Sequence, residues 1–207
     1  MTEVRIPADD GFFMPAEWEP HERCWMQWPS RGDVWGERLP QAYAAYAQVA
    51  RAIAQFEPVS MVCRPDDEPQ VRLACGRGVE IVPIPIDDSW ARDSGPIFLI
   101  DGKGSVCGTH WGFNAWGNAY SNYENDAALG GRILQRLGMR TYKGRMVFEG
   151  GSISVDGYGT LLTTEECLLN DNRNPELTRQ QIEERLALTL GVARIVWLDR
   201  GLQDDET

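Results

Sequence analysis

The sequence predicts one α/β domain, in which short strands alternate with amphipathic helices. β-rich apolar segments recur between segments whose apolar residues have helical spacing. A unit of hairpin, helix and strand also occurs twice, in residues 96–142 and 152–198, at a spacing typical of propellers and solenoids. No low-complexity linker interrupts the 207 residues, so we expect a single domain over residues 1–207.

Turn and helix-end residues set the boundaries of these elements. Pro40 suits the first turn of one helix, and Gly138 and Gly191 stop the other two. Turns at residues 101–104 and 156–157 join the two hairpins. The expected helices are residues 40–56, 124–137 and 176–190, and the expected strands are residues 24–28, 59–63, 79–86, 96–100, 105–109, 146–148, 152–155, 160–163 and 194–198.

Composition excludes several classes of function. The formal charge of −11 argues against nucleic-acid binding, which needs a basic face; it suits a cationic small substrate or simply a soluble surface. No run of 18 apolar residues indicates a membrane span, and the N-terminus lacks the pattern of a signal peptide. Five scattered cysteines without a CxxC motif, and only two histidines, disfavour a zinc site or a disulfide framework, so we expect reduced cysteines in the cytoplasm.

The segment "DDSWARD" follows the predicted strand 79–86 and gathers three carboxylates, a tryptophan and an arginine. Ligands commonly bind where strands of α/β folds end. Carboxylates such as Asp93 can accept paired N–H bonds from a guanidinium, and Trp90 can add a cation–π contact. The alternative is a capped turn, in which Asp87 or Ser89 caps a helical turn and Arg92 forms a surface ion pair.

Three further segments give these residues a context: "FMPAEWEPHERCWMQWP", "WGFNAWGN" and "FEGGSISVDGYGTLLTTEECLLNDNRNP". With "DDSWARDSGP", they resemble the agmatine deiminase family of the guanidine-modifying pentein superfamily, over residues 14–207. The resemblance implies an α/β propeller of pseudo-repeated ββαβ units, incomplete here, with about three of five blades. It also implies hydrolysis of agmatine to N-carbamoylputrescine and ammonia through a Cys thiolate intermediate, in putrescine and polyamine biosynthesis, with no cofactor and no metal.

The resemblance assigns roles to four residues. Asp93 matches a carboxylate that clamps the guanidinium, and Trp90 matches an aromatic residue of the substrate wall. Glu149 matches an acidic position that lines the pocket, or is instead a structural carboxylate bonded to the N–H groups of its Gly-Gly turn. Glu206 matches an acidic position near the substrate amine, or is instead part of a solvated terminus.

The chain departs from the family pattern at its end. In the family, a segment with the catalytic His and a second clamping Asp follows the stretch that ends here at Thr207, and the nucleophilic Cys lies further on. We therefore expect this chain alone to be inactive, and to form a homo-oligomer or associate with the missing C-terminal part. Cys167, His21 and His110 are expected to be structural.

Two other functions remain open. One is a peptidyl-arginine deiminase, whose substrate carries a carboxylate that an arginine would be expected to capture. The region between Asp93 and Gly131 contains Lys103 and no arginine, which favours an amine-ended substrate such as agmatine. The other is an inactive fragment that acts only as a binding or structural module.

Overall fold

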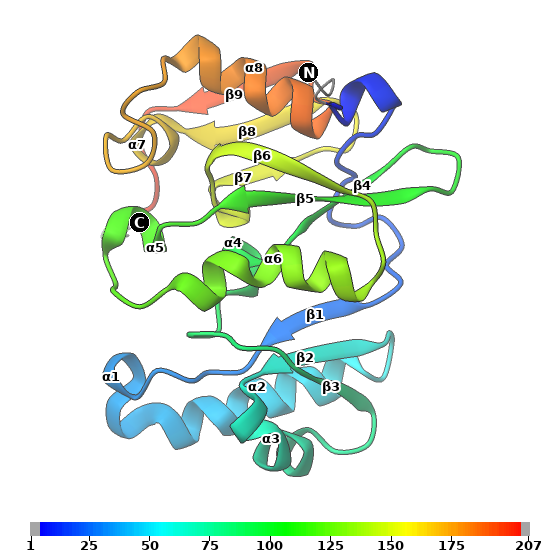
Figure 1. Cartoon of the computed structure of the whole chain (residues 1–207), viewed down its shortest axis with the longest axis vertical. Coiled ribbons are helices and arrows are strands. Elements are labelled where there is room, and N and C mark those ends of the chain that lie inside the picture. Colours follow the sequence, from blue (N-terminus) through cyan, green and yellow to red (C-terminus); the bar gives the residue numbers. More distant parts are fainter. Residues whose placement is uncertain (1–4, 204–207) are drawn as a thin grey trace. The chain divides into compact units, whose positions relative to one another are not determined.

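The structure, a computed structural model, describes residues 5–203, which form three separate three-stranded sheets (Figure 1). The chain divides into two compact units. Unit 1 comprises residues 1–19, 92–121 and 130–207, and unit 2 comprises residues 20–91 and 122–129. The expectation of one domain over residues 1–207 stays a prediction. Within residues 5–203, no helix combines the length and apolar character needed to cross a bilayer.

Unit 2 contains a parallel sheet in the order β1 (Cys24–Gln27), β2 (Val59–Cys63) and β3 (Val79–Pro83). Parallel neighbours need crossover connections, which α2 (Leu39–Ile53) and α3 (Glu68–Cys75) provide. The two helices pack against each other (Figure 1), and α2 buries three alanines against the core. β2 is the central strand and is buried throughout, which explains its mostly apolar sequence; its one polar residue, Ser60, donates to Glu80 at 2.8 Å.

Unit 1 contains the other two sheets, β4 (Ile97–Ile100), β5 (Val106–Gly112) and β6 (Thr141–Val147), and β7 (Ile153–Val155), β8 (Thr160–Thr164) and β9 (Arg194–Leu198). In each sheet the first two strands form an antiparallel hairpin and the third pairs parallel with the second. Helix α6 (Glu124–Arg136) connects β5 to β6, with residues 124–129 assigned to unit 2, and α8 (Arg179–Leu190) connects β8 to β9. The two predicted ββαβ units are therefore confirmed.

The two hairpins of unit 1 also share turn chemistry. Asp101 Oδ1 accepts hydrogen bonds from the backbone N–H groups two and four residues later, at 2.8 and 2.9 Å. Asp156 Oδ1 accepts the equivalent pair, again at 2.8 and 2.9 Å. Both turns have the sequence Asp-Gly-x-Gly, so the internal repeat extends to the residues that close each hairpin.

Local sequence explains where the long helices begin and end. Thr178 and Gln181 form a capping box at the start of α8, and Gly191, with φ of 68°, ends that helix. Pro40 lies in the first turn of α2, as predicted. The four short helices are α1 (Gly32–Trp35), α4 (Ala91–Ser94), α5 (Ala115–Asn118) and α7 (Glu165–Leu168), and single 3-10 turns occur at Ala8–Asp10, Gly36–Arg38, Pro65–Asp67 and Gly150–Ser152.

Some predicted boundaries were wrong. β3 stops at Pro83 rather than Ile86, because Pro85 has no backbone N–H with which to continue the ladder. β6 runs over Thr141–Val147 instead of residues 146–148. Its exposed Lys143 and Arg145 and its central Gly144 hide the strand from a reading based on apolar residues. Helix α3 was not predicted.

Candidate functional site

The "DDSWARD" segment begins with a carboxylate that caps a distant helix within unit 2. Asp87 Oδ2 accepts from the backbone N–H groups of Asn125 and Asp126, at 2.8 and 3.2 Å, near the start of α6. The Asp126 carboxylate accepts in return from the backbone N–H groups of Asp87 and Asp88, at 2.9 and 3.0 Å. Burial raises the pKa of Asp126 to about 6, against the opposing effect of these two hydrogen bonds. Asp87 therefore caps a helix, as the alternative interpretation proposed, but the helix begins 37 residues later.

Asp88 holds two indole rings in unit 2. Its Oδ1 accepts from the Nε1–H of Trp35 at 3.0 Å, and its Oδ2 accepts from the Nε1–H of Trp90 at 3.1 Å. Oδ1 also accepts from the backbone N–H of Ser30 at 3.1 Å. The Asp88 residue is buried, and the Trp90 residue is 36% exposed. Asp88 therefore orients Trp90, the predicted substrate-wall residue, and both carboxylate oxygens take part in holding the structure.

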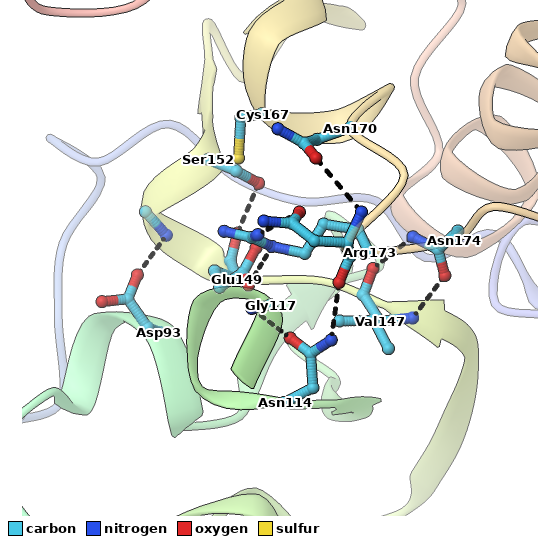
Figure 2. A network of polar contacts seen from close by, with 12 residues as sticks. Asp93, Asn114, Gly117, Val147, Glu149, Ser152, Cys167, Asn170, Arg173 and Asn174 are labelled. Atoms are coloured by element: carbon cyan, nitrogen blue, oxygen red, sulfur yellow. Dashed lines mark hydrogen bonds and ion pairs between the residues drawn. The ribbon is translucent and has the colours of Figure 1, made fainter. Parts of the chain in front are cut away.

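Asp93 belongs to unit 1 and approaches the Gly-Gly turn after β6. Its Oδ1 accepts from the backbone N–H of Gly151 at 3.0 Å (Figure 2). A Cβ at Gly151 would lie 2.3 Å from that oxygen, and a Cβ at Gly150 would lie 2.3 Å from the carbonyl oxygen of Arg92. Both glycines are thus required for the turn to pack against residues 92 and 93.

Arg92, which neighbours Asp93 in the sequence, has other partners. Its Nη1 pairs with Glu17 Oε1 at 2.5 Å, and its Nη2 donates to the carbonyl oxygen of Ile153 at 3.3 Å. Both groups lie in unit 1. The surface ion pair foreseen for Arg92 is therefore present, and its partner is Glu17.

Glu149 forms a buried ion pair within unit 1. Its Oε1 accepts from Arg173 Nε at 2.7 Å, and the two side chains are only 2% and 1% exposed (Figure 2). Within residues 5–203, Glu149 Oε2 and Arg173 Nη2 have no hydrogen-bond partner. Burial raises the pKa of the Glu149 carboxyl; Arg173 opposes this rise and the nearby charge of Asp93 adds to it. Two carboxylates, Asp93 and Glu149, therefore influence each other electrostatically on either side of the Gly-Gly turn.

A network of asparagines supports this ion pair (Figure 2). Arg173 Nη1 donates to Asn172 Oδ1 at 2.6 Å, and Asn114 Nδ2 donates to the carbonyl oxygen of Asn172 at 2.9 Å. The Asn174 side chain exchanges two hydrogen bonds with the backbone of Val147, at 2.8 and 2.9 Å, two residues before Glu149. The loop that carries Arg173 is therefore tied both to the end of β6 and to the "WGFNAWGN" segment.

The "WGFNAWGN" segment adopts a left-handed turn. Ala115, Trp116, Gly117 and Asn118 have φ angles of 51°, 56°, 84° and 64°. Left-handed backbone costs roughly 1–2 kcal/mol at a residue such as Ala or Trp. Asn114 offsets this by accepting from the N–H of Gly117 at 2.8 Å, and a Cβ at Gly117 would overlap the side chain of Asn172. The strained turn thus packs directly against the loop that holds Arg173.

The remaining predicted residues have simpler surroundings. Glu206 lies outside the described residues. His110 is half-buried against Gly130 and Gly131, and burial lowers the pKa of its imidazole. Cys167 is partly buried in α7. The alternative for Glu149, bonding to its Gly-Gly turn, differs from the observed contacts, because Asp93 accepts the Gly151 N–H.

Sequence reasoning missed the partners that hold these carboxylates. Arg173, Asp126 and the three asparagines of the network were not singled out, although Arg173 lies in the quoted "NDNRNP" motif. An arginine and several asparagines within one loop were the available signal. Nothing in their spacing, however, indicates that Arg173 meets a glutamate 24 residues earlier.

Comparison with known proteins identifies the class. Residues 13–207 match the sequence model of the Porphyromonas-type peptidyl-arginine deiminases. The chain has the α/β fold of solved agmatine deiminases. It superimposes on the agmatine deiminase of Enterococcus faecalis, described as catalysing its reaction, with a TM-score of 0.93 and 37% identity. The superposition covers 97% of this chain and 56% of that chain.

The curated relatives agree with this result. The agmatine deiminase of Pseudomonas aeruginosa is 49% identical over 207 residues, covering 97% of this chain and 56% of that protein. The agmatine deiminase of Stutzerimonas stutzeri is 46% identical over 212 residues, covering 100% and 58%. The chain belongs to the Porphyromonas-type peptidyl-arginine deiminase family and is similar to its agmatine deiminases. It spans a little under three fifths of the length of these relatives.

Proposed function

We propose that this chain is the guanidinium-binding part of an agmatine deiminase. In the complete enzyme, water and agmatine would be converted to N-carbamoylputrescine and ammonia, a step toward putrescine and the polyamines. The observation that carries the proposal is the pair of neighbouring carboxylates at the Gly-Gly turn, Asp93 and Glu149. One oxygen of the buried Glu149, Oε2, lacks a donor within residues 5–203.

A guanidinium suits this pair on chemical grounds. It is a planar cation with N–H donors in a fixed fork, and carboxylates accept from it with charge-assisted hydrogen bonds of roughly 1.5–3 kcal/mol each. A buried carboxylate oxygen without a donor is costly, so a substrate N–H at Glu149 Oε2 would offset part of that cost. Asp93 would clamp the guanidinium and Glu149 would line the same pocket. Trp90, held by Asp88, is proposed as the aromatic wall.

The chemistry then follows nucleophilic catalysis. A Cys thiolate would add to the central guanidinium carbon, and the resulting intermediate would expel ammonia after proton transfer from a His, leaving an amidino-thioether. Water would add to this carbon, and collapse of the adduct would return the thiolate and release the carbamoyl product. The family resemblance places three further residues in the part of the relatives that this chain does not cover: the nucleophilic Cys, the His and the second clamping Asp. We therefore propose that the chain by itself is inactive. The residues expected to act here are Asp93, Trp90, Glu149 and Glu206.

Peptidyl-arginine deimination is the second candidate, favoured by the description of the matching family. The names of the similar proteins and the absence of arginine from residues 94–130 favour agmatine. Location in the cytoplasm, assembly as a homo-oligomer and a propeller of about three blades in this chain also remain proposals.

The test is to complete the chain with the part of the Pseudomonas aeruginosa agmatine deiminase that it does not match, and to measure ammonia release. Agmatine should be turned over at a higher kcat/KM than an arginine-containing peptide, and Asp93→Asn should abolish turnover. Equal loss on replacing Asp66, an exposed carboxylate of unit 2, would argue against a specific role for Asp93. Preference for the peptide would instead support the second candidate.

A haloacetamidine tests the inactive-fragment alternative. The reagent should label the completed protein at one cysteine and leave the 207-residue chain unlabelled. Turnover or specific labelling by the chain alone would show that its own cysteines suffice, against the proposal.

A further inference from the structure

A second group of chemically active side chains lies in unit 2, where the sheet begins. His21, Cys24 and Glu57 each offer one ligand atom, and the three atoms lie within 4.8 Å of one another. The Cys24 thiol donates to Glu57 Oε1 at 3.0 Å, and His21 Nδ1 lies 3.4 Å from Glu57 Oε2. The mechanism proposed above uses none of these residues.

The fold, rather than local sequence, brings the three together. β1 and β2 are parallel and begin side by side, with Cys24 opposite Val59. The backbone N–H of Cys24 donates to the carbonyl oxygen of Pro58 at 2.9 Å, which fixes Glu57 beside the start of β1. The neighbouring Arg23 is engaged elsewhere, with Glu80 at 2.5 Å and Ser60 at 2.8 Å.

From this geometry we propose that His21, Cys24 and Glu57 bind a zinc-class divalent ion. A thiolate, an imidazole and a carboxylate are the three ligand types that Zn²⁺ takes in proteins, at about 2.3, 2.0 and 2.0 Å. Tetrahedral angles then separate the sulfur or nitrogen from the oxygen by about 3.3–3.5 Å. The Cys24 sulfur lies 3.0 Å from Glu57 Oε1 and the His21 nitrogen lies 3.4 Å from Glu57 Oε2. Coordination through a single Glu57 oxygen therefore requires the carboxylate to rotate, with the three ligand atoms already within 4.8 Å of one another.

Binding exchanges the thiol proton for the metal. The Cys24 proton, now donated to Glu57, would pass to solvent, and the thiolate, one Glu57 oxygen and an imidazole nitrogen would occupy three positions, with water in the fourth. The ion would fasten the start of β1 to the segment that leads into β2 and so stabilise unit 2. A thiol lacks affinity for Mg²⁺ and Ca²⁺, so these ions should not compete.

The sequence expectation against zinc rested on scattered cysteines without a CxxC motif and on only two histidines. The sheet topology nevertheless brings one cysteine and one histidine beside a glutamate. Cys24 and Glu57 are 33 residues apart, yet parallel pairing makes them neighbours. The competing interpretation is a hydrogen-bonded cluster with no affinity for metal.

Cobalt(II) absorption of the 207-residue chain decides between the two interpretations. Co²⁺ should give visible d–d bands of tetrahedral intensity and a near-ultraviolet thiolate-to-cobalt band, and equimolar Zn²⁺ should remove both. Cys24→Ser keeps a donor to Glu57 but should abolish the thiolate band and weaken Co²⁺ binding at least about tenfold. Cys167→Ser, which removes another partly buried thiol, should leave the spectrum unchanged.

His21→Gln provides a second variant that should fold, because the His21 side chain is 47% exposed. It should keep the thiolate band but weaken Co²⁺ binding at least about tenfold. Zn²⁺, but not Mg²⁺, should raise the Tm of the wild-type chain. The proposal is overturned if saturating Co²⁺ gives no thiolate band, or if the band survives in Cys24→Ser.

Discussion

Replacing Arg173 with methionine should strongly destabilise unit 1, because it leaves the Glu149 carboxylate buried and unpaired. The two side chains are 1% and 2% exposed, and the ion pair is joined at 2.7 Å. Removing one partner of such a pair costs about 3–5 kcal/mol. Removing one partner of an exposed ion pair costs about 1 kcal/mol or less. Arg72→Met, which breaks the exposed ion pair between Arg72 and Glu68 in α3, is the matched control.

The double variant Glu149→Gln/Arg173→Met separates charge from packing. It removes both charges and keeps similar volumes, so it should be less destabilised than the sum of the single variants by about 1–3 kcal/mol. Urea unfolding at pH 7, followed by circular dichroism and tryptophan fluorescence, gives these free energies. A loss below about 1 kcal/mol for Arg173→Met, or strict additivity in the cycle, would refute the reasoning.

The pH dependence gives an independent check. Burial already raises the pKa of Glu149 above its unfolded value, and removing Arg173 takes away the main opposing effect. The folded state then binds more protons than the unfolded state, so stability falls as pH rises above the unfolded pKa. Arg173→Met should therefore recover stability as the pH is lowered toward 4–5, relative to wild type. A deficit that does not change with pH would indicate lost packing rather than an unpaired carboxylate.

The other predictions concern the turn, the capped helix and the substrate amine. Gly151→Ala should lower kcat/KM for agmatine of the completed enzyme at least tenfold, because the added Cβ would displace the Asp93 carboxylate. Gly32→Ala, where a Cβ meets nothing within 4 Å, should have little effect. Equal effects of the two variants would contradict the claim that Gly151 is needed for the close approach of Asp93. The pKa of Asp126 is raised from 3.8 to about 6, so the folded state binds the extra proton in this range. The free energy of unfolding of the wild type should therefore fall by up to about 3 kcal/mol as the pH rises from 4 to 6. Asp126→Asn should remove this pH dependence, as measured by urea unfolding at several pH values. Glu206→Gln in the completed enzyme should raise KM for agmatine and reduce its preference over arginine, and an unchanged kcat/KM ratio would place amine recognition elsewhere.

The sequence was sufficient for the parts of the fold that depend on local chemistry. Turn residues such as Asp101 and Asp156, and the stop at Gly191, act within a few residues of their own position. The hairpin, helix and strand order was therefore predictable. β6 was not fully predicted, because alternating basic residues and Gly144 remove the apolar signal.

Of the candidate site, only the residues that we propose to face the substrate could be predicted from the sequence. Asp93 was singled out because it follows a predicted strand, and both Asp93 and Glu149 match acidic positions of the family that the sequence resembles. The contacts between distant segments could not be predicted: Arg173, the partner of Glu149, lies 24 residues after it, and Asp87 in unit 2 caps a helix that begins 37 residues later. Neither contact has a local pattern, because each is made by the tertiary fold.

The central claim is that Asp93 holds the guanidinium of the substrate. The most direct test is a crystal structure of the completed enzyme with agmatine bound, in a variant in which the cysteine proposed as nucleophile, in the Pseudomonas part, is replaced by serine. The account predicts guanidinium nitrogens about 2.7–3.2 Å from the Asp93 carboxylate oxygens, with Glu149 Oε2 facing the same group. A guanidinium bound away from Asp93, with the Gly151 N–H still donating to that carboxylate, would contradict it.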